Sequence, residues 1–373
     1  MKNRVFSSLF IVGAVVNFAA CSKDDNNTTP GVPSYEVPTT YTFENVDFKE
    51  ATARVRMLSA INSYMSTTQS NASQVTLEQT KVNNMWTNSS QPFDTTWLNT
   101  SGVNLQEKTA DATLYKSYLD SLVTLSAATL TPAANGQAGY ITRNAGKILI
   151  SKNGLEYVQA VQKGTMGAAL FKEAMALLDQ VPNSDNNTVI AGKGTAMAHN
   201  FDLAFGYFSV PVNYDTSKAF ADANRPSLVF WGNYIRERGL FINAHDVLWK
   251  AFRTGRAAIA AKDTKVIGEQ VAIIKEYWEK VAAAAAWAYL SSPQSAAGNL
   301  ASQFHALSEG FGFLASLKYR PSSSKLSAAD YQKLVDIVGA GTNFYDLIGD
   351  ANFTRLKEAV AILKNAYGQL QAE

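Results

Sequence analysis

The sequence predicts an all-α protein whose helices pack as bundles. Apolar residues after position 50 recur at spacings of three and four, which is the period of an amphipathic helix. Runs that alternate in the manner of a strand are few and short. Clusters of Pro, Gly and Asn divide the apolar stretches into lengths that suit helices joined by loops.

The chain begins with the pattern of a secretory signal peptide. Two basic residues precede an apolar run over residues 6–16, and small residues then lead to Cys21, the single cysteine. The apolar run is too short for a stable transmembrane helix. Its end resembles a bacterial lipobox, in which the cysteine becomes the lipidated first residue, although Phe18 stands where leucine is usual. We therefore predict a lipoprotein signal peptide over residues 1–20 and a lipid on Cys21.

The residues after Cys21 predict where the mature protein is located. Ser22-Lys23-Asp24-Asp25 is similar to the export signal of lipoproteins on the outer face of the outer membrane; a solvated start to a linker is the alternative. Residues 21–40 are rich in Asn, Thr and Pro and lack an apolar period, which is typical of a flexible tether. The sequence thus predicts a surface-exposed outer-membrane lipoprotein that contacts the membrane through its lipid.

Charge and cysteine content limit the classes of function. Loss of Lys2 and Arg4 with the signal peptide takes the formal net charge from +2 to about zero, which predicts no nucleic-acid partner. With Cys21 lipidated, no thiol remains for a disulfide or a thiolate metal site.

Apolar stripes place the main helices of the domain that we expect over residues 41–373. The stripes are Val55, Leu58, Ile61 and Met65; Leu114, Tyr118, Leu122 and Leu125; Ile267, Val271, Ile274, Trp278 and Val281; and Phe353, Leu356, Val360, Leu363 and Tyr367. Residues 41–48 and 147–150 are the best strand candidates, and residues 291–293 predict a helix end. The alanine run over residues 282–286 predicts a helix surface that a neighbour approaches closely.

A weak internal sequence similarity, called the echo below, predicts a duplication. Residues 199–208 align with residues 305–314 so that His, Phe and Gly coincide. If the echo is real, the domain divides into two related lobes, at 41–190 and 191–373. A chance match is the alternative.

Each echoing segment carries a histidine and a carboxylate one helical turn apart. His199 precedes Asp202 by three residues, and His305 precedes Glu309 by four, so on helices each pair shares a face. Imidazole and carboxylate groups both bind divalent metals, and two such helices that face one another would supply four ligands. We predict that these four residues hold a divalent metal or iron. A hydrogen-bonded structural pair and a proton-transfer pair are the alternatives.

Three further residues are candidate ligand contacts. Lys163 and Arg256 would reach an anionic ligand, and Tyr207 joins them, whereas solvated or capping roles are the alternative. Trp86 and Trp97 would suit stacking on a sugar or packing at the edge of the core. Motifs for zinc proteases, phosphate loops, dinucleotide binding and nucleophile elbows are absent, so no catalytic residue is assigned.

Five sequence stretches together carry a family resemblance. They are Tyr41-Thr-Phe-Glu-Asn-Val-Asp-Phe48, Gly154-Leu-Glu-Tyr157 leading to Lys163-Gly-Thr-Met-Gly-Ala168, Ala204-Phe-Gly-Tyr-Phe208, Phe230-Trp-Gly-Asn-Tyr234 and Gly255-Arg-Ala-Ala-Ile259. The set resembles a family of bacterial surface lipoproteins that carries domain of unknown function 4856. The resemblance covers nearly the whole mature chain and implies no established activity. The family pattern has Trp-Asp-Glu before Ala-Phe-Gly-Tyr-Phe, whereas this chain keeps only the acidic Asp202.

A looser similarity is to imelysin-like proteins, which carry a Gly-x-His-x-x-Glu motif. Residues 303–309 have one extra residue before the glutamate, and residues 198–202 have the spacing with Asp in place of Glu. The similarity implies an all-α fold of two bundles and a link to iron uptake.

The sequence therefore predicts a surface lipoprotein that binds a ligand, with a metal ion as the first candidate and an outer-membrane transporter as a partner. One alternative is a metal-dependent peptidase or hydrolase, which would need the same residues and an open coordination position. The other is a glycan-binding partner of an outer-membrane importer, which would use Trp86 or Trp97.

Overall fold

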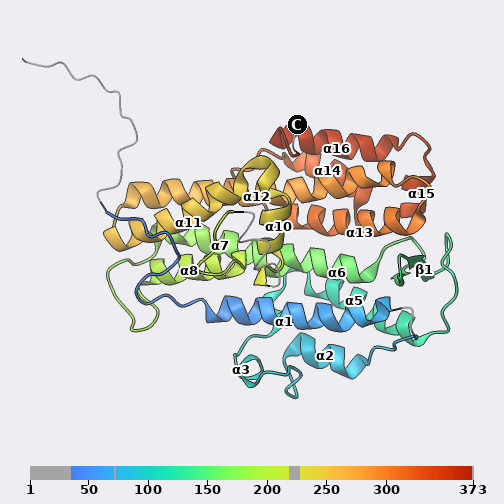
Figure 1. Cartoon of the computed structure of the whole chain (residues 1–373), viewed down its shortest axis with the longest axis horizontal. Coiled ribbons are helices and arrows are strands. Elements are labelled where there is room, and N and C mark those ends of the chain that lie inside the picture. The colour runs from blue at the N-terminus through green and yellow to red at the C-terminus, as the bar shows by residue number, and fades with distance from the viewer. Residues whose placement is uncertain (1–34, 71–72, 218–226, 372–373) are drawn as a thin grey trace, which may run out of the picture. The chain divides into compact units, whose positions relative to one another are not determined.

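The structure, a computed structural model, describes residues 35–70, 73–217 and 227–371 (Figure 1). Within it, Val37–Glu373 forms one compact unit. The predicted signal peptide, Cys21 and most of the predicted tether lie outside the described residues.

Helices build this unit almost entirely, which confirms the predicted all-α class. The α-helices are α1 (Lys49–Ser66), α2 (Gln79–Thr87), α3 (Thr96–Asn99), α4 (Leu105–Lys108), α5 (Ala112–Ala127), α6 (Tyr157–Thr165), α7 (Lys172–Gln180), α8 (Ala196–Phe208), α10 (Trp231–Glu237), α11 (Ala244–Ala261), α12 (Thr264–Ser295), α13 (Leu300–Ser316), α14 (Ala328–Val338), α15 (Phe344–Gly349) and α16 (Thr354–Tyr367). Short 3₁₀ helices are η1 (Thr67–Gln69), η3 (Val181–Asn183), η5 (Gly239–Ile242) and η6 (Leu317–Tyr319), and η2 (Met166–Phe171) is a π-helix. None of the described helices has the length and apolar character needed to cross a bilayer.

The strand candidate at 147–150 is confirmed, and the candidate at 41–48 is wrong. Strands β1 (Gly139–Arg143) and β2 (Gly146–Ile150) pair antiparallel, with Gly139 opposite Ile150. Residues 41–48 form no strand and lie instead against α8, where the Tyr41 ring stacks on Phe205 at 3.6 Å between ring centres. Tyr41 is therefore buried against a helix and not in a sheet, while Phe43, Val46 and Phe48 are half-buried.

Helix α12 lies at the centre of the packing, between α11 and α13 (Figure 1). Its alanine run Ala282–Ala286 is fully buried, as predicted, because methyl side chains let neighbouring helices approach closely. The predicted helix end at 291–293 is wrong, since α12 continues through Pro293 to Ser295. A proline in the last turn removes one hydrogen bond of the helix, and here the Pro293 carbonyl accepts one from the Gln303 side chain at 3.1 Å.

The predicted stripes of α1 and α12 are buried in full, whereas in α5 Leu122 is buried as predicted but the first half of the stripe is displaced by one residue. Tyr115 and Leu119 are buried, and Leu114 and Tyr118 are half-buried. The reason is tertiary: the Tyr115 ring lies so close to Gly164 of α6 that a Cβ there would be 2.3 Å from the ring. A shift of one residue along an α-helix rotates the buried face by about 100°.

Helices from both sides of residue 190 pack on one another. Helix α6 lies along α13, and α7 lies along α8. Residue 190 therefore does not divide the chain into separate compact units. The duplication of two lobes stays a prediction.

Candidate ligand-binding site

The predicted metal ligands on α8 make structural contacts. Asp202 is fully buried, and its Oδ1 accepts hydrogen bonds from the Tyr41 hydroxyl at 2.7 Å and from Nε of Arg256 at 2.9 Å. Burial raises the pKa of Asp202 to about 6, against the opposing effects of Arg256 and Tyr41. The Nδ1 atom of His199 is buried without a hydrogen bond to any described residue. Asp202 thus joins the segment before α1 to α11.

The predicted metal ligands on α13 lie in a chain of four ionisable side chains. His305 Nδ1 is 2.7 Å from Oε2 of Glu156, and His305 Nε2 is 3.8 Å from Oε1 of Glu309. The same Glu309 oxygen is 3.3 Å from Nζ of Lys163. Glu156 is fully buried, and the other three side chains are mostly buried. This row of side chains therefore links the start of α6 to its last turn through α13.

Glu156 is fixed by side chains of two elements, η1 and α13. Its Oε1 accepts a hydrogen bond from the Gln69 side chain at 3.0 Å, and its backbone N–H donates to the Ser308 hydroxyl at 2.8 Å. It directly precedes α6, where the positive end of the helix dipole favours a carboxylate. Because Glu156 is held in place, its contact with Nδ1 sets the orientation of the His305 ring.

The predicted four-ligand metal site is not formed. Helix α8 packs on α1, α7 and α11, whereas α13 packs on α6 and α12. Among residues 35–70, 73–217 and 227–371, no group of three or more His, Cys, Asp and Glu side chains could hold an ion. In the α13 cluster, Glu156 and Glu309 lie at opposite nitrogens of one imidazole, so an ion at either nitrogen would not reach both carboxylates.

A pocket of about 360 Å³ opens beside Lys163, and we call it the Lys163 pocket. Polar side chains of α1 and α6 face apolar side chains from η2 and the segment that leads to α10. The lining is Ser59, Asn62, Ser63, Ser66, Gln162, Lys163, Met166, Leu228, Val229, Phe230, Asn233 and Tyr234. An apolar wall opposite a few placed polar groups is typical of a small-molecule site.

Two polar groups of the Lys163 pocket have donors without acceptors. Asn62 is only 8% exposed, and its carboxamide makes no hydrogen bond with any described residue. The Lys163 ammonium has three donors, of which Gln162 Oε1 at 3.0 Å and Glu309 Oε1 at 3.3 Å take two. Neither donor is among the fully enclosed polar atoms, so both are accessible in the pocket, which suits a ligand that brings oxygen acceptors.

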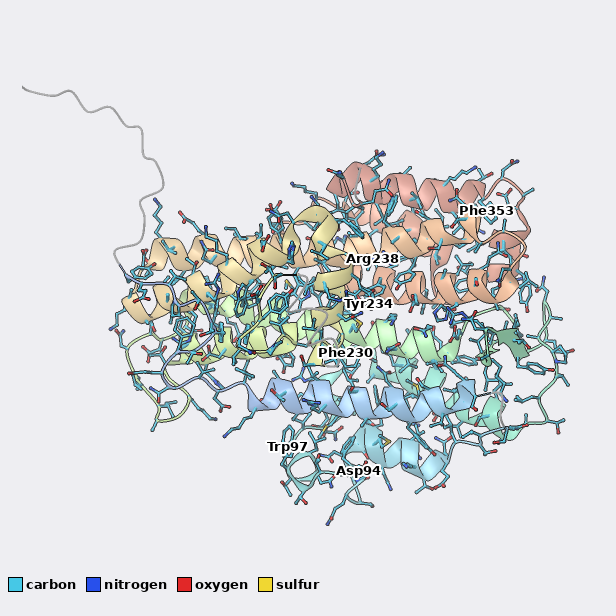
Figure 2. The ribbon with its side chains drawn as sticks, viewed as in Figure 1. Asp94, Trp97, Phe230, Tyr234, Arg238 and Phe353 are labelled. Carbon is cyan, nitrogen blue, oxygen red and sulfur yellow. The ribbon has the colours of Figure 1, made fainter. Side chains whose placement is uncertain are left out.

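The backbone on both sides of the Lys163 pocket is irregular. Phe230 has φ 47° and ψ −117°, a conformation that costs a non-glycine residue about 1–3 kcal/mol. Figure 2 labels Phe230 and Tyr234, which flank the start of α10. On the other side, α6 passes into the π-helix η2, where the Met166 carbonyl accepts a hydrogen bond from Trp231 Nε1 at 3.0 Å. Strained residues and π-helices both gather at functional sites.

Two tyrosines lie next to Lys163. Its Nζ is 5.3 Å from the centre of the Tyr234 ring, and the Tyr234 and Tyr289 hydroxyls are 3.1 Å apart. Burial raises the pKa of both phenols, and the charge of Glu309 adds to the rise. Both tyrosines therefore stay protonated at neutral pH.

The other two predicted ligand contacts lie in the core. Tyr207 is 1% exposed and lies beneath the Arg54 guanidinium, 4.7 Å from the ring centre. Arg256 is 4% exposed and donates to Asp202 and, at 3.1 Å, to the carbonyl of Glu44. Lys163 and Arg256 each line a pocket and each keep donors that no described residue accepts, since an ammonium has three donors, a guanidinium has five, and two are taken in each case.

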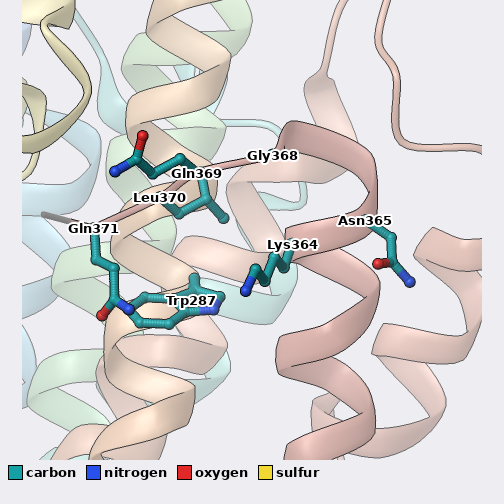
Figure 3. A pocket seen from close by; sticks show the side chains of 7 residues that line it. All are labelled: Trp287, Lys364, Asn365, Gly368, Gln369, Leu370 and Gln371. Atoms are coloured by element: carbon teal, nitrogen blue, oxygen red, sulfur yellow. The ribbon is translucent and has the colours of Figure 1, made fainter. Parts of the chain in front are cut away.

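The tryptophans predicted to stack on a sugar differ in exposure. Trp86 is fully buried, so it belongs to the core, and Trp97 is 45% exposed on α3 (Figure 2). An aromatic ring among amides occurs instead at Trp287, in a pocket of about 550 Å³ lined also by Lys364, Asn365, Gly368, Gln369, Leu370 and Gln371 (Figure 3).

Sequence reasoning found Lys163, His305 and Glu309 but missed two of their partners. Glu156 had a usable signal, because it lies in the stretch 154–157 on which the family resemblance rests. Asn62 had none, since one amide among the polar positions of an amphipathic helix is ordinary.

Comparisons with known proteins add one match. Residues 38–368 match the model of a family described as "Domain of unknown function (DUF4856)". Neither the curated proteins nor the solved structures contain a match to the chain.

Proposed function

The chain belongs to the DUF4856 family, and from that premise we propose that it is a surface lipoprotein whose helical domain binds a small, oxygen-rich organic molecule in the Lys163 pocket. Lys163 lies in one of the stretches that carry the family resemblance, and Phe230, Asn233 and Tyr234 lie in another. Two segments far apart in the sequence thus form opposite walls of one pocket.

One observation supports this ligand class above the others. Asn62 and Lys163 each offer a donor that no described residue accepts, and both line the pocket. Carboxylate, phosphate and hydroxyl oxygens would satisfy both donors, and the apolar wall at Leu228 and Phe230 would cover a carbon skeleton.

We propose an organic ligand in place of a metal ion because the His305 cluster is closed by its own ion pairs. Glu309 forms an ion pair with Lys163, and Oε2 of Glu156 lies 2.7 Å from Nδ1 of His305. A metal-dependent peptidase would need an open coordination position in the same cluster. The closed cluster therefore argues against a metal-dependent peptidase.

The surface location is proposed from the N-terminal sequence pattern. The leader, the single Cys21 and the acidic residues after it suit a lipid anchor on the outer face of the outer membrane. An outer-membrane transporter would then be the natural recipient of the bound molecule.

The test is a binding screen on the full chain purified in detergent. Thermal shift against organic acids, sugar phosphates and free sugars would select ligands, and calorimetry would measure their affinity. We expect Lys163→Met and Asn62→Leu each to weaken binding by about tenfold or more, because each removes a hydrogen-bond donor from a buried site. Lys265→Met is the matched control, since its side chain is 81% exposed, and it should leave the affinity unchanged.

Two results would count against this function. One is a ligand that all three variants bind as tightly as the wild type. The other is a saccharide whose binding is lost in Trp287→Ala and kept in Lys163→Met, which would favour the glycan alternative at the Trp287 pocket of Figure 3.

A further inference from the structure

A second pocket, of about 300 Å³, lies where the middle of α12 meets the end of α16 and the loop after η6. Its charged lining is Glu276, Glu279, Lys280 and Lys325, and we call it the Glu279 pocket. It shares no residue with the Lys163 pocket.

Glu279 is buried, with one carboxylate oxygen held and the other open. The side chain is 2% exposed, and its Oε1 accepts hydrogen bonds from the Tyr367 hydroxyl at 2.5 Å and from the Ser324 hydroxyl. Its Oε2 accepts no hydrogen bond from the described residues, and it is not among the fully enclosed polar atoms. The two hydroxyls fix the orientation of the carboxyl group, so Oε2 is presented in a defined direction.

No cation of the described residues forms an ion pair with the carboxylate of Glu279. Burial raises its pKa, against the hydroxyl donors and the more distant charge of Arg320. The Arg320 guanidinium donates instead to the carbonyls of Leu317 and Leu326. A buried carboxylate in this state favours a positively charged partner.

Lys280 supplies the opposite charge on the same pocket. It is half-buried, and its ammonium makes no ion pair with any described residue. The other two charged groups neutralise one another, since Lys325 lies 3.4 Å from Glu276 and both side chains are largely exposed. The pocket thus presents one unpaired anion and one unpaired cation.

We propose that the Glu279 pocket binds a small zwitterion of the α-amino acid class, with the ligand ammonium at Oε2 of Glu279 and the ligand carboxylate at Nζ of Lys280. Such a ligand satisfies both unpaired charges at once. An amine alone or an acid alone satisfies one and leaves the other unpaired. The volume lies at the small end of the range for ligand pockets, which suits a single amino acid.

Calorimetric titration of the full chain in detergent tests the ligand class. The twenty standard amino acids are the probes, and L-alanine is compared with propylamine and propionate, which each carry one of its two charges. We expect at least one amino acid to bind. Its single-charge analogues should bind with an affinity at least about tenfold lower. Absence of amino-acid binding, or an amine or acid that binds equally well, would overturn the assignment.

Variants test the two contacts. Glu279→Gln keeps an oxygen for Tyr367 and Ser324 but removes the charge, and Lys280→Met keeps the stem but removes the ammonium. Each should weaken amino-acid binding by about tenfold or more, while Lys265→Met, which lies outside the pocket with its side chain 81% exposed, should not. Lys163→Met should also leave amino-acid binding intact, which separates a failure here from a failure at the Lys163 pocket. Equal binding by wild type, Glu279→Gln and Lys280→Met would disprove the proposal.

Discussion

At the scale of single residues, two buried carboxylates with similar surroundings have different roles. Asp202 on α8 pairs with Arg256, and Glu309 on α13 pairs with Lys163. Arg256 gives two of its five donors to Asp202 and to the carbonyl of Glu44, so this pair joins α8 and α11 to the segment before α1. Lys163 keeps one donor beside a pocket, because an ammonium carries three and only two are taken. The Lys163 pair therefore lies at the proposed ligand pocket, whereas the Arg256 pair holds segments of the chain together.

The pKa of Asp202 predicts a pH effect on stability. Folding raises it from 3.8 to about 6, so between these pH values the unfolded chain releases a proton that the folded protein keeps. The free energy of unfolding should therefore fall as pH rises through this window. The wild type should lose up to about 3 kcal/mol relative to Asp202→Asn, which cannot titrate there.

Urea denaturation of both proteins at pH 4, 5, 6 and 7 would measure this difference, and above about pH 6 it should become constant. A wild type that gains stability over Asp202→Asn between pH 4 and 6 would show the opposite sign. In that case the charge of Arg256 would outweigh burial.

At the scale of helices, glycines set how closely the elements of the site approach. A Cβ at Gly312 of α13 would lie 2.4 Å from the Cβ of Lys163 and 2.8 Å from the backbone N of Gly164. Gly206 of α8 has the same role against Ala51 of α1. The contact of α13 with α6 therefore both holds the bundle together and positions Lys163.

We expect Gly312→Ala to lower the free energy of unfolding by about 1–3 kcal/mol, because α13 and α6 must separate to admit the methyl group. Gly268→Ala on α12 is the matched control, since a Cβ there has no neighbour within 4 Å. The control should raise stability by up to about 1 kcal/mol through helix propensity. Denaturant unfolding measures both. Equal stability of Gly312→Ala and the wild type would show that α13 and α6 accommodate the methyl group without loss of packing.

At the scale of the whole molecule, a compact helical unit over Val37–Glu373 follows the predicted leader and the single cysteine. The predicted lipid on Cys21 is then the predicted membrane anchor, and its attachment depends on one sulfur atom.

We expect Cys21→Ser to move the protein from the membrane fraction to the soluble fraction and to abolish incorporation of labelled fatty acid. Cell fractionation with immunoblotting measures the first effect, and metabolic labelling measures the second. Ser22→Ala is the control and should leave both unchanged. Membrane association that persists in Cys21→Ser would require another anchor.

The sequence by itself determined the helical class, the buried stripes of α1 and α12 and the packing role of Ala282–Ala286. These properties follow from local periodicity and side-chain size, which a linear pattern records. Only the tertiary structure decided which face of α5 is buried and which groups pair with the predicted site residues. Glu156 and His305 are 149 positions apart, and the spacing of residues within one helix carries no information on a partner from another. The geometry of the predicted metal site was wrong for the same reason. The prediction required α8 and α13 to face one another, but each of these helices packs on different neighbours.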